Sequence, residues 1–388
     1  MLLNSMSRVR KPFLFLLISA LAGACSAPDG RDLGKATQVA PGVALYRLSD
    51  QSLLDPPGPI AIQILRLDSA RIRLKSALSQ DQILGTETVL EMASRHGAIA
   101  AVNAGFFAPN GDPSGLLQID GELVSDTHRP RGAVAVDVDK SGRTTLLFDV
   151  VTAQARLRAG GAEPIPIAGI DTVRQRGKLM LFTPKYFEHT DTAANGIEWV
   201  VAGSPPTVRE RRVDLGSAPI PAAGFVLSFG GLEPPPPLDA LDAGSKISIE
   251  RRFATRHGTA PEAWAAADHV IGGAGLLMRN GTSIEEWSIE DLRAGFTTER
   301  HPRTVIGTDA SGAVWLVTID GRNPQISLGM TFGELHRLVR RLRLTNALNL
   351  DGGGSTTMVV RGAVVNHPSD PTGPRKVSDA LLVVERLD

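Results

Sequence analysis

The chain has 388 residues, of which 42% are hydrophobic and 21% charged, the balance of a soluble globular protein. Its 41 basic and 41 acidic side chains cancel, so nothing in the composition predicts a basic surface, and we expect no nucleic-acid partner. A single cysteine excludes an intramolecular disulfide, while 40 glycines and 26 prolines predict many turns and a β-rich fold.

The N-terminus reads as a targeting segment. A basic stretch at residues 8–11 precedes an apolar run at 12–22, which is too short to span a bilayer as a permanent helix. The segment Leu21-Ala22-Gly23-Ala24-Cys25 that follows resembles a bacterial lipobox, with its small residues shifted by one position. We therefore expect a lipid anchor on Cys25. An ordinary secretory signal with an incidental cysteine is the alternative.

This reading divides the chain into three parts. Residues 1–25 are a lipoprotein-type signal peptide ending at the lipidated cysteine, 26–37 are a polar tether, and 38–388 are one large domain. Ser26 directly after the cysteine fits retention at the outer membrane. We expect an exported protein on the periplasmic side of the cell envelope, held at the membrane through Cys25.

The first half of the domain predicts strands with one helix. A capping box at Thr88 and Glu91 opens a helix that stops at Gly97, and a buried strand at 98–102 then ends in a turn that contains Asn103. Short β-like runs separated by Gly, Pro and Asp turns predict the remaining strands at 43–46, 60–67, 72–76, 133–138, 144–151, 178–182, 198–202 and 224–229.

The last third repeats this order of elements. Strands at 304–306 and 313–319 precede a second capping box at Thr331 and Glu334, whose helix leads to an apolar run at 347–350. Many strands with few long helices predict an α+β fold, with helices packed on a mostly antiparallel or mixed β-sheet core in a single large domain.

The apolar run at 347–350 ends in the most informative motif of the chain: Asp351, Gly352, Gly353, Gly354, Ser355, Thr356 and Thr357. Three consecutive glycines cost backbone entropy, which a chain accepts where the backbone turns sharply or approaches a ligand. Exposed amides in such a turn attract anions. We interpret the motif as a phosphate or sugar site with a carboxylate at its edge. A tight hairpin turn is the alternative interpretation.

Three arginines are predicted to lie near strand ends. Arg303 precedes a strand, Arg322 follows Asp320-Gly321 at the end of the next, and Arg375 lies shortly before the last strand. A guanidinium group is suited to gripping phosphate oxygens with two hydrogen bonds. Together with the glycine loop, these side chains favour an anion-binding site.

These motifs resemble the phosphodiester glycosidase domain family. The resemblance runs from near Gln38 to the C-terminus and is most specific in the last third. The segments that carry it are 102–107, 271–277, 302–307, 318–322, 327–331, 334–335, 347–356 and 375–380.

The resemblance implies hydrolysis of a sugar that is joined through its anomeric carbon to a phosphate. The residues carried over from the family motifs are Asn103, Arg303, Asp320, Asp351, Ser355, Thr356 and Arg375. As catalytic residues we expect Asp351, Asp320 and Asn103, with Asn103 bonded to a sugar hydroxyl. Substrate and phosphate binding is expected from Arg303, Arg322, Arg375, Gly352, Gly353, Gly354, Ser355 and Thr356.

The chemistry fits this site. A phosphate monoester leaves readily, because its second pKa is about 6, and it needs mainly stabilisation of its charge. Asp351 or Asp320 would activate water or attack the anomeric carbon, and the sequence leaves open which of these occurs. No cofactor is certain, and the metal is unknown. The two aspartates would suit Ca²⁺ or Mg²⁺, which prefer oxygen ligands.

Two other functions stay open. The same groups would suit a phosphodiesterase that cuts the P–O bond, or a lipoprotein that binds envelope glycans without cleaving them.

Overall fold

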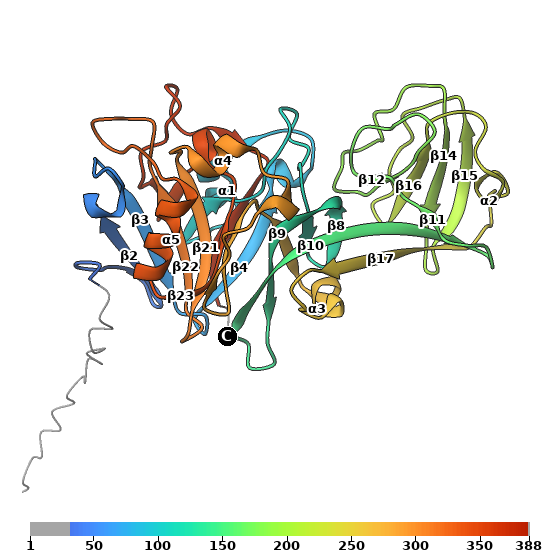
Figure 1. Cartoon of the computed structure of the whole chain (residues 1–388). Helices are drawn as coiled ribbons and strands as arrows, with labels where there is room; N and C mark the ends of the chain where they lie inside the picture. The colour runs from blue at the N-terminus through green and yellow to red at the C-terminus, as the bar shows by residue number, and fades with distance from the viewer. Residues whose placement is uncertain (1–31, 387–388) are drawn as a thin grey trace, which may run out of the picture. The chain divides into compact units, whose positions relative to one another are not determined.

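Strands separated by Gly, Pro and Asp turns dominate the fold, as the alternating apolar pattern predicts (Figure 1). The computed structural model describes residues 32–386, so the signal peptide, Cys25 and the first half of the tether lie outside the described residues. Residues from Leu33 onward form one compact unit. Among the described strands, the named pairs are antiparallel except the pair β12–β13.

The first β-sheet has eight strands. Its strands in spatial order are β1 (Thr37–Ala40), β2 (Val43–Leu48), β3 (Ile62–Leu67), β22 (Val314–Ile319), β21 (Arg303–Asp309), β23 (Leu344–Asn349), β19 (Leu276–Arg279) and β20 (Thr282–Ser283).

A five-stranded sheet faces it across the main core. Leu65 and Leu316 from the first sheet belong to the same buried cluster as Leu74, Val102 and Leu381 from the second. The strands of this second sheet in spatial order are β25 (Ala363–Val364), β24 (Met358–Val360), β6 (Ala100–Asn103), β27 (Asp379–Glu385) and β4 (Ile72–Leu78), and β26 (Lys376–Val377) pairs with β5 (Glu87–Thr88) nearby.

A third sheet continues into the middle of the chain. The 16-residue strand β10 pairs with β9 over its first half and with β17 over residues 151–159, and these long strands are prominent in Figure 1. The strands are β11 (Ile165–Pro166), β10 (Thr144–Ala159), β9 (Thr127–Val138), β18 (His269–Gly272), β7 (Leu117–Ile119), β8 (Glu122–Ser125) and β17 (Ile247–Thr255).

The fourth sheet packs with β10 and β17 around a second buried hydrophobic cluster. Trp199, Leu181 and Leu227 from this sheet pack with Leu157 and Phe253. Its strands in spatial order are β12 (Gly169–Ile170), β13 (Leu179–Phe182), β16 (Gly224–Phe229), β14 (Ile197–Ala202) and β15 (Thr207–Val213).

Two helices begin at the predicted capping boxes, and both boxes are complete. Thr88 and Glu91 cap α1 (Val89–Arg95), and Thr331 and Glu334 cap α5 (Phe332–Arg341). The other helical segments are short: α2 (Pro236–Asp239), α3 (Pro261–Ala266), α4 (Ala294–Thr298), and the 3₁₀ turns η1 (Gln51–Leu53), η2 (Ser79–Asp81), η3 (Ser288–Glu290) and η4 (Gly353–Ser355).

The fold is therefore strongly β-rich with few helices, which agrees with the coarse α+β expectation. Helix α5 covers the outer face of the eight-stranded sheet, where Leu335 and Leu338 pack with Val305 and Trp315. Within residues 32–386, no helix has the length and apolar character needed to span a membrane.

Candidate active site

The candidate site lies where the ends of β6 and β23 meet. The backbone amide of Asp351 donates to the carbonyl of Ala104 at 3.0 Å, which joins the loop after β23 to the loop after β6. These two strands belong to the two sheets that enclose the main core. Residues that are 247 positions apart in sequence are thereby brought into contact.

Asn103 fastens this junction. Its Nδ2 donates to the carbonyl of Asp351 at 2.7 Å, while its Oδ1 accepts from Thr304 Oγ1 at 2.7 Å and from the Thr357 amide at 3.1 Å. The side chain is fully buried. We expected Asn103 to bond a sugar hydroxyl, and this geometry corrects that expectation. Asn103 holds the Asp351 loop in place and is not exposed to a substrate.

Asp351 is the acid at the centre of the site. Burial raises its pKa to about 6, and the negative charge of Asp379 adds to this rise. The Ser355 hydroxyl, the Gly352 amide and the positive charge of Arg375 act in the opposite direction and lower the pKa. An acid with a pKa near neutrality and an arginine nearby has the properties of a general acid–base group.

Asp379, at the start of β27, is the second acid and was absent from the predicted site. It is 1% exposed, and burial raises its pKa to about 6. The Gly105 amide donates to both carboxylate oxygens at 3.1 Å, and Ser378 Oγ donates to Oδ1 at 2.8 Å. The negative charge of Asp379 in turn contributes to the raised pKa of Asp351, after the larger effect of burial.

The glycine loop is less open than we predicted. The Gly352 amide donates to Asp351 Oδ1 at 2.8 Å, and the Gly353 amide donates to the carbonyl of Pro302 at 2.9 Å. Only the Gly354 amide of these three has no partner among the described residues. The predicted concavity of three bare amides is therefore wrong, and one amide stays available to an anion.

The glycines make room for two guanidinium groups. A Cβ on Gly353, whose φ is +60°, would lie 2.9 Å from Arg322 Nη2, and a Cβ on Gly354 would overlap the side chains of Arg375 and Asp370. Arg375 donates Nε to Asp370 Oδ2 at 2.7 Å and Nη2 to Oδ1 at 3.0 Å. Two of the three predicted arginines thus lie on the loop.

Arg303 points elsewhere. Its guanidinium donates to the carbonyls of Met330, Phe296 and Glu299, and it lies over the rings of Phe296 and Phe332 at 5.0 and 4.9 Å. Burial, followed by the charge of Arg322, lowers its pKa to about 10, which leaves it charged at neutral pH. This geometry corrects the expected phosphate contact: Arg303 anchors the segments around α4 and α5.

Asp320 is also committed to protein contacts. Its Oδ1 accepts from Asn366 Nδ2 and from the His367 amide, each at 3.0 Å, and its Oδ2 accepts from Gln63 Nε2 at 3.2 Å. The carboxylate is 2% exposed, and burial raises its pKa. A direct catalytic role for Asp320 stays a prediction, and these contacts favour Asp351 as the reactive acid.

The hydroxyl groups after the glycines are all buried. Ser355 and Thr356 are each 1% exposed, and Thr357 is fully buried. The hydroxyls of Thr356 and Thr357 have no hydrogen-bond partner among the described residues, although buried polar groups usually have one. These positions suit contacts to a bound polar group or water, so their predicted binding role stays open.

Within residues 32–386, no group of three or more His, Cys, Asp or Glu side chains has the arrangement of a metal site. The predicted Ca²⁺ or Mg²⁺ remains untested, since oxygen ligands also come from carbonyls, hydroxyls and water.

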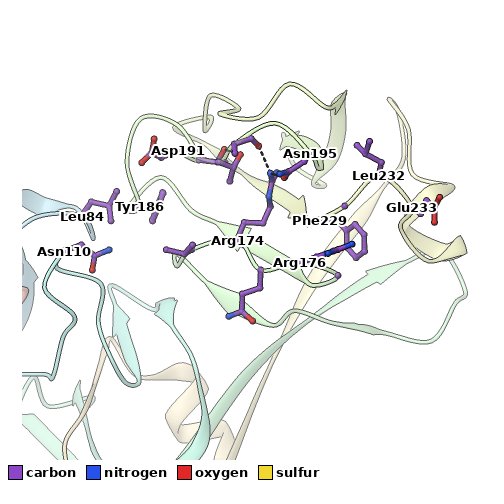
Figure 2. A pocket seen from close by; sticks show the side chains of 18 residues that line it. Leu84, Asn110, Arg174, Arg176, Tyr186, Asp191, Asn195, Phe229, Leu232 and Glu233 are labelled. Carbon is purple, nitrogen blue, oxygen red and sulfur yellow. Dashed lines mark hydrogen bonds between the residues drawn. The ribbon is translucent and has the colours of Figure 1, made fainter.

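A large cavity lies in the region of the fourth sheet. It has a volume of about 1130 Å³ and is lined by residues that include Arg174, Tyr186 and Phe229 (Figure 2). Arg174 Nη2 donates to Asn195 Oδ1 at 3.1 Å, so this cation is held by the cavity wall. None of the predicted catalytic or binding residues lines this cavity.

Comparison with known proteins bears on the motif-rich part of the chain. Residues 195–384 match the family model described as phosphodiester glycosidase. The resemblance to this family is thereby confirmed. The matched range includes Asp320, Asp351, Arg375 and Asp379, and Asn103 lies before it.

A curated relative supports the same family resemblance. The N-acetylglucosamine-1-phosphodiester alpha-N-acetylglucosaminidase of Mus musculus is 35% identical over 131 residues, which are 30% of this chain and 25% of the relative. The chain thus spans about a quarter of the length of this relative.

Solved structures share the fold over most of the chain. A hypothetical protein from Synechocystis matches with a TM-score of 0.75 and 23% identity, over 91% of this chain and 64% of that one. A putative exported protein from Burkholderia pseudomallei matches with a TM-score of 0.73 and 24% identity, over 84% of this chain and 74% of that one. At these identities the likeness concerns the fold alone.

The acids and the histidine that sequence reasoning missed had weak local signals. Asp379 stands directly before the apolar run at 380–384, and Asp370 lies five residues before Arg375. His367 follows an Asn in a loop. An acid at the start of a buried strand was the one signal that pointed to Asp379.

Proposed function

We propose that this chain is a hydrolase that cleaves the bond between the anomeric carbon of a sugar and the oxygen of a phosphodiester. The family match supports a hydrolase of the glycosidase type. The observation that carries the specific proposal is the raised pKa of Asp351, to which the charge of Asp379 contributes, next to Arg375 and the glycine loop. A sugar or glycan joined to an aglycone through a phosphodiester is the substrate that this arrangement fits.

Each group has a distinct task in this reaction. Asp351, when ionised, takes a proton from the attacking water or attacks the anomeric carbon itself. Burial, with a smaller contribution from the charge of Asp379, keeps the pKa of Asp351 high, so that the carboxylate is a competent base near neutral pH. The C–O bond breaks with its electron pair on the phosphate oxygen.

The departing phosphate needs compensating charge. Arg322 and Arg375 lie against Gly353 and Gly354, and the Gly354 amide is the one free donor of the three glycines in the described structure. Charge-assisted hydrogen bonds from guanidinium groups and a bare amide stabilise a growing negative charge more in the transition state than in the ground state. Asn103 supports this site from below by holding the Asp351 loop.

Hydrolysis in heavy-oxygen water tests the bond that breaks. We expect a panel of sugar-1-phosphodiesters to give a free sugar with the label at the anomeric carbon. Label in the phosphate would instead indicate a phosphodiesterase, and binding to glycans without product would indicate a non-catalytic glycan protein. The same assay with a chelator, and with Ca²⁺ or Mg²⁺ added back, tests the metal requirement.

We also propose that the protein is exported and anchored through Cys25 at the periplasmic side of the cell envelope, in the outer membrane. The basic residues, the short apolar run and the lipobox-like segment support this location. Labelling with a radioactive fatty acid should mark the wild-type protein and leave Cys25→Ser unlabelled. Labelling of both would contradict the anchor.

A further inference from the structure

A small cavity opens beside the glycine loop, next to Arg322. It has a volume of about 110 Å³, and its lining includes Asp320, Arg322, His367 and Ser369. Arg322 connects it to the loop, because a Cβ on Gly353 would lie 2.9 Å from Arg322 Nη2. The cavity therefore adjoins the candidate active site and is bounded by side chains of the two loops at 320–327 and 367–369.

Arg322 differs from the other two arginines of the site region. Its side chain is exposed and has no hydrogen-bond or ion-pair partner among the described residues. Arg375 is held by Asp370 through two hydrogen bonds, and Arg303 is enclosed by carbonyls and rings. Of these three guanidinium groups, Arg322 is the one with all its donors free for an anion.

His367 is oriented by a buried acid. Its Nδ1 lies 3.2 Å from Asp320 Oδ2, and its backbone amide donates to Oδ1 of the same carboxylate at 3.0 Å. Asn366 Nδ2 and Gln63 Nε2 also donate to this carboxylate, which identifies it as an acceptor. Nδ1 of His367 therefore carries the hydrogen, and Nε2 is left for another partner. The side chain is 63% exposed.

Ser369 adds a neutral donor to the same cavity. Its Oγ is buried and has no hydrogen-bond partner among the described residues, although it is only two residues from His367. A buried hydroxyl without a partner is uncommon in native proteins and often marks a place for a ligand or water. The cavity thus has one cation, one oriented imidazole and one free hydroxyl.

We propose that Arg322, His367 and Ser369 form the subsite that binds the phosphate of the substrate and holds it as it leaves the sugar. This inference rests on the proposed function, and it assigns attack at the anomeric carbon and departure of the phosphate to different groups. Asp351 acts at the anomeric carbon, and this subsite receives the phosphate oxygen that keeps the electron pair of the broken bond. The charged groups that face the imidazole in the cavity are Asp320 and Arg322.

The hydrogen bonds balance in this arrangement. The guanidinium of Arg322 and the Ser369 hydroxyl donate to phosphate oxygens. The imidazole of His367 donates from Nε2 when its ring is cationic, and the carboxylate of Asp320 then accepts from Nδ1 as counter-ion. No group outside the protein and the substrate is needed for this step.

Inorganic phosphate is a direct probe, because its binding requires no turnover. Calorimetry and NMR of the His367 ring should show phosphate binding to the wild-type protein with a shift of the ring resonances. Loss of a charge-assisted hydrogen bond in Arg322→Gln or His367→Gln should weaken that binding about tenfold or more. Ser369→Ala should weaken it less, and His189→Gln in the fourth-sheet region, where His189 contacts Ser217, should leave it unchanged.

Unaltered phosphate affinity in both Arg322→Gln and His367→Gln would overturn the subsite, and so would a wild-type protein that binds no phosphate. The proposed function fails separately, when the wild-type protein cleaves no sugar-phosphodiester. Phosphate binding that depends on His367 without any cleavage would keep the subsite and remove the glycosidase.

Discussion

Two aspartates in different regions have raised pKa values, and only one of them has the surroundings of a reactive site. Asp171 follows β12 in the fourth-sheet region and is fully buried, and burial raises its pKa well above the usual value. The Thr183 amide and hydroxyl donate to it at 2.6 and 2.7 Å. These contacts hold the loop after β12 against the end of β13.

Asp351 differs in what surrounds it. A second acid and Arg375 both act on its charge, and the glycine loop lets guanidinium groups approach the backbone. The large cavity of Figure 2 lies near the Asp171 loop, with Val173 in its lining, and a cavity of about 110 Å³ lies beside the glycine loop that follows Asp351. Neither a shifted pKa nor a large cavity is sufficient by itself to identify a catalytic site. An acid, a cation and a closely approaching backbone that lie together are the stronger indication.

The sharpest contrast is between Asp351→Asn and Asp171→Asn. Both changes replace one carboxyl oxygen by an amide nitrogen with little change in shape. We expect Asp351→Asn to lower kcat/KM for a sugar-1-phosphodiester roughly 10²–10⁴-fold, the usual range for a general acid–base group. Asp171→Asn should keep the wild-type rate. Steady-state kinetics checks both, and equal losses would break the contrast between the regions.

The correction of Arg303 predicts an effect on folding. Arg303→Met removes the guanidinium donor from the carbonyls of Met330, Phe296 and Glu299, of which Met330 keeps the His301 amide, and should lower the free energy of unfolding by about 3 kcal/mol or more. Arg211→Met, at a surface pair with Asp239, should cost about 1 kcal/mol or less. Urea denaturation measures both. Full stability of Arg303→Met, with weaker phosphate binding, would restore the anion-binding role.

The close packing of the glycine loop predicts that Gly354→Ala is harmful. The added methyl group would overlap the side chains of Arg375 and Asp370, so the guanidinium of Arg375 would have to move. Such misplacement of a catalytic group lowers kcat/KM roughly 10–100-fold. Gly161→Ala is the matched control, since nothing lies within 4 Å of the added carbon there. A fully active Gly354→Ala would show that the loop does not position Arg375.

The acid pair predicts a pH dependence of stability. The folded-state pKa of Asp379 is about 6 against a usual value of 3.8, so the folded state keeps a proton that the unfolded state loses. Its contribution is therefore most favourable below the unfolded pKa and is lost as pH rises through about 6.

Asp379→Asn should reduce the fall in the free energy of unfolding between about pH 5 and about pH 7.5 by about 1–2 kcal/mol. Urea denaturation at the two pH values measures the difference, with the exposed Asp242→Asn as control. An unchanged pH slope in Asp379→Asn would mean that Asp379 is ionised in the folded state at low pH.

Local sequence was sufficient for the two capped helices and for many of the strands, while strands such as β15 and β17 were not predicted. Both capping boxes and the glycine loop are short-range signals, and each lies where it was predicted. Arg303 was misread because alternation along β21 was not applied: Thr304 faces Asn103, so the neighbouring Arg303 must point to the opposite face of the sheet.

Asp379 could not be placed from local sequence. It reaches the site because β27 pairs with β6, in a register that sets Ala380 opposite Asn103. That pairing joins residues 277 positions apart and depends on how the whole five-stranded sheet assembles. Long-range strand register is the part of a site that short motifs do not contain.

The central claim is that Asp351 has a raised pKa at the glycine loop and that the negative charge of Asp379 contributes to this rise. Carboxyl ¹³C NMR of the wild-type protein and of Asp379→Asn tests it most directly. We predict that Asp351 titrates with a pKa of about 6 in the wild-type protein and at a lower pH once the charge of Asp379 is removed. Titration of Asp351 near its usual value of 3.8, unchanged by Asp379→Asn, would contradict the claim.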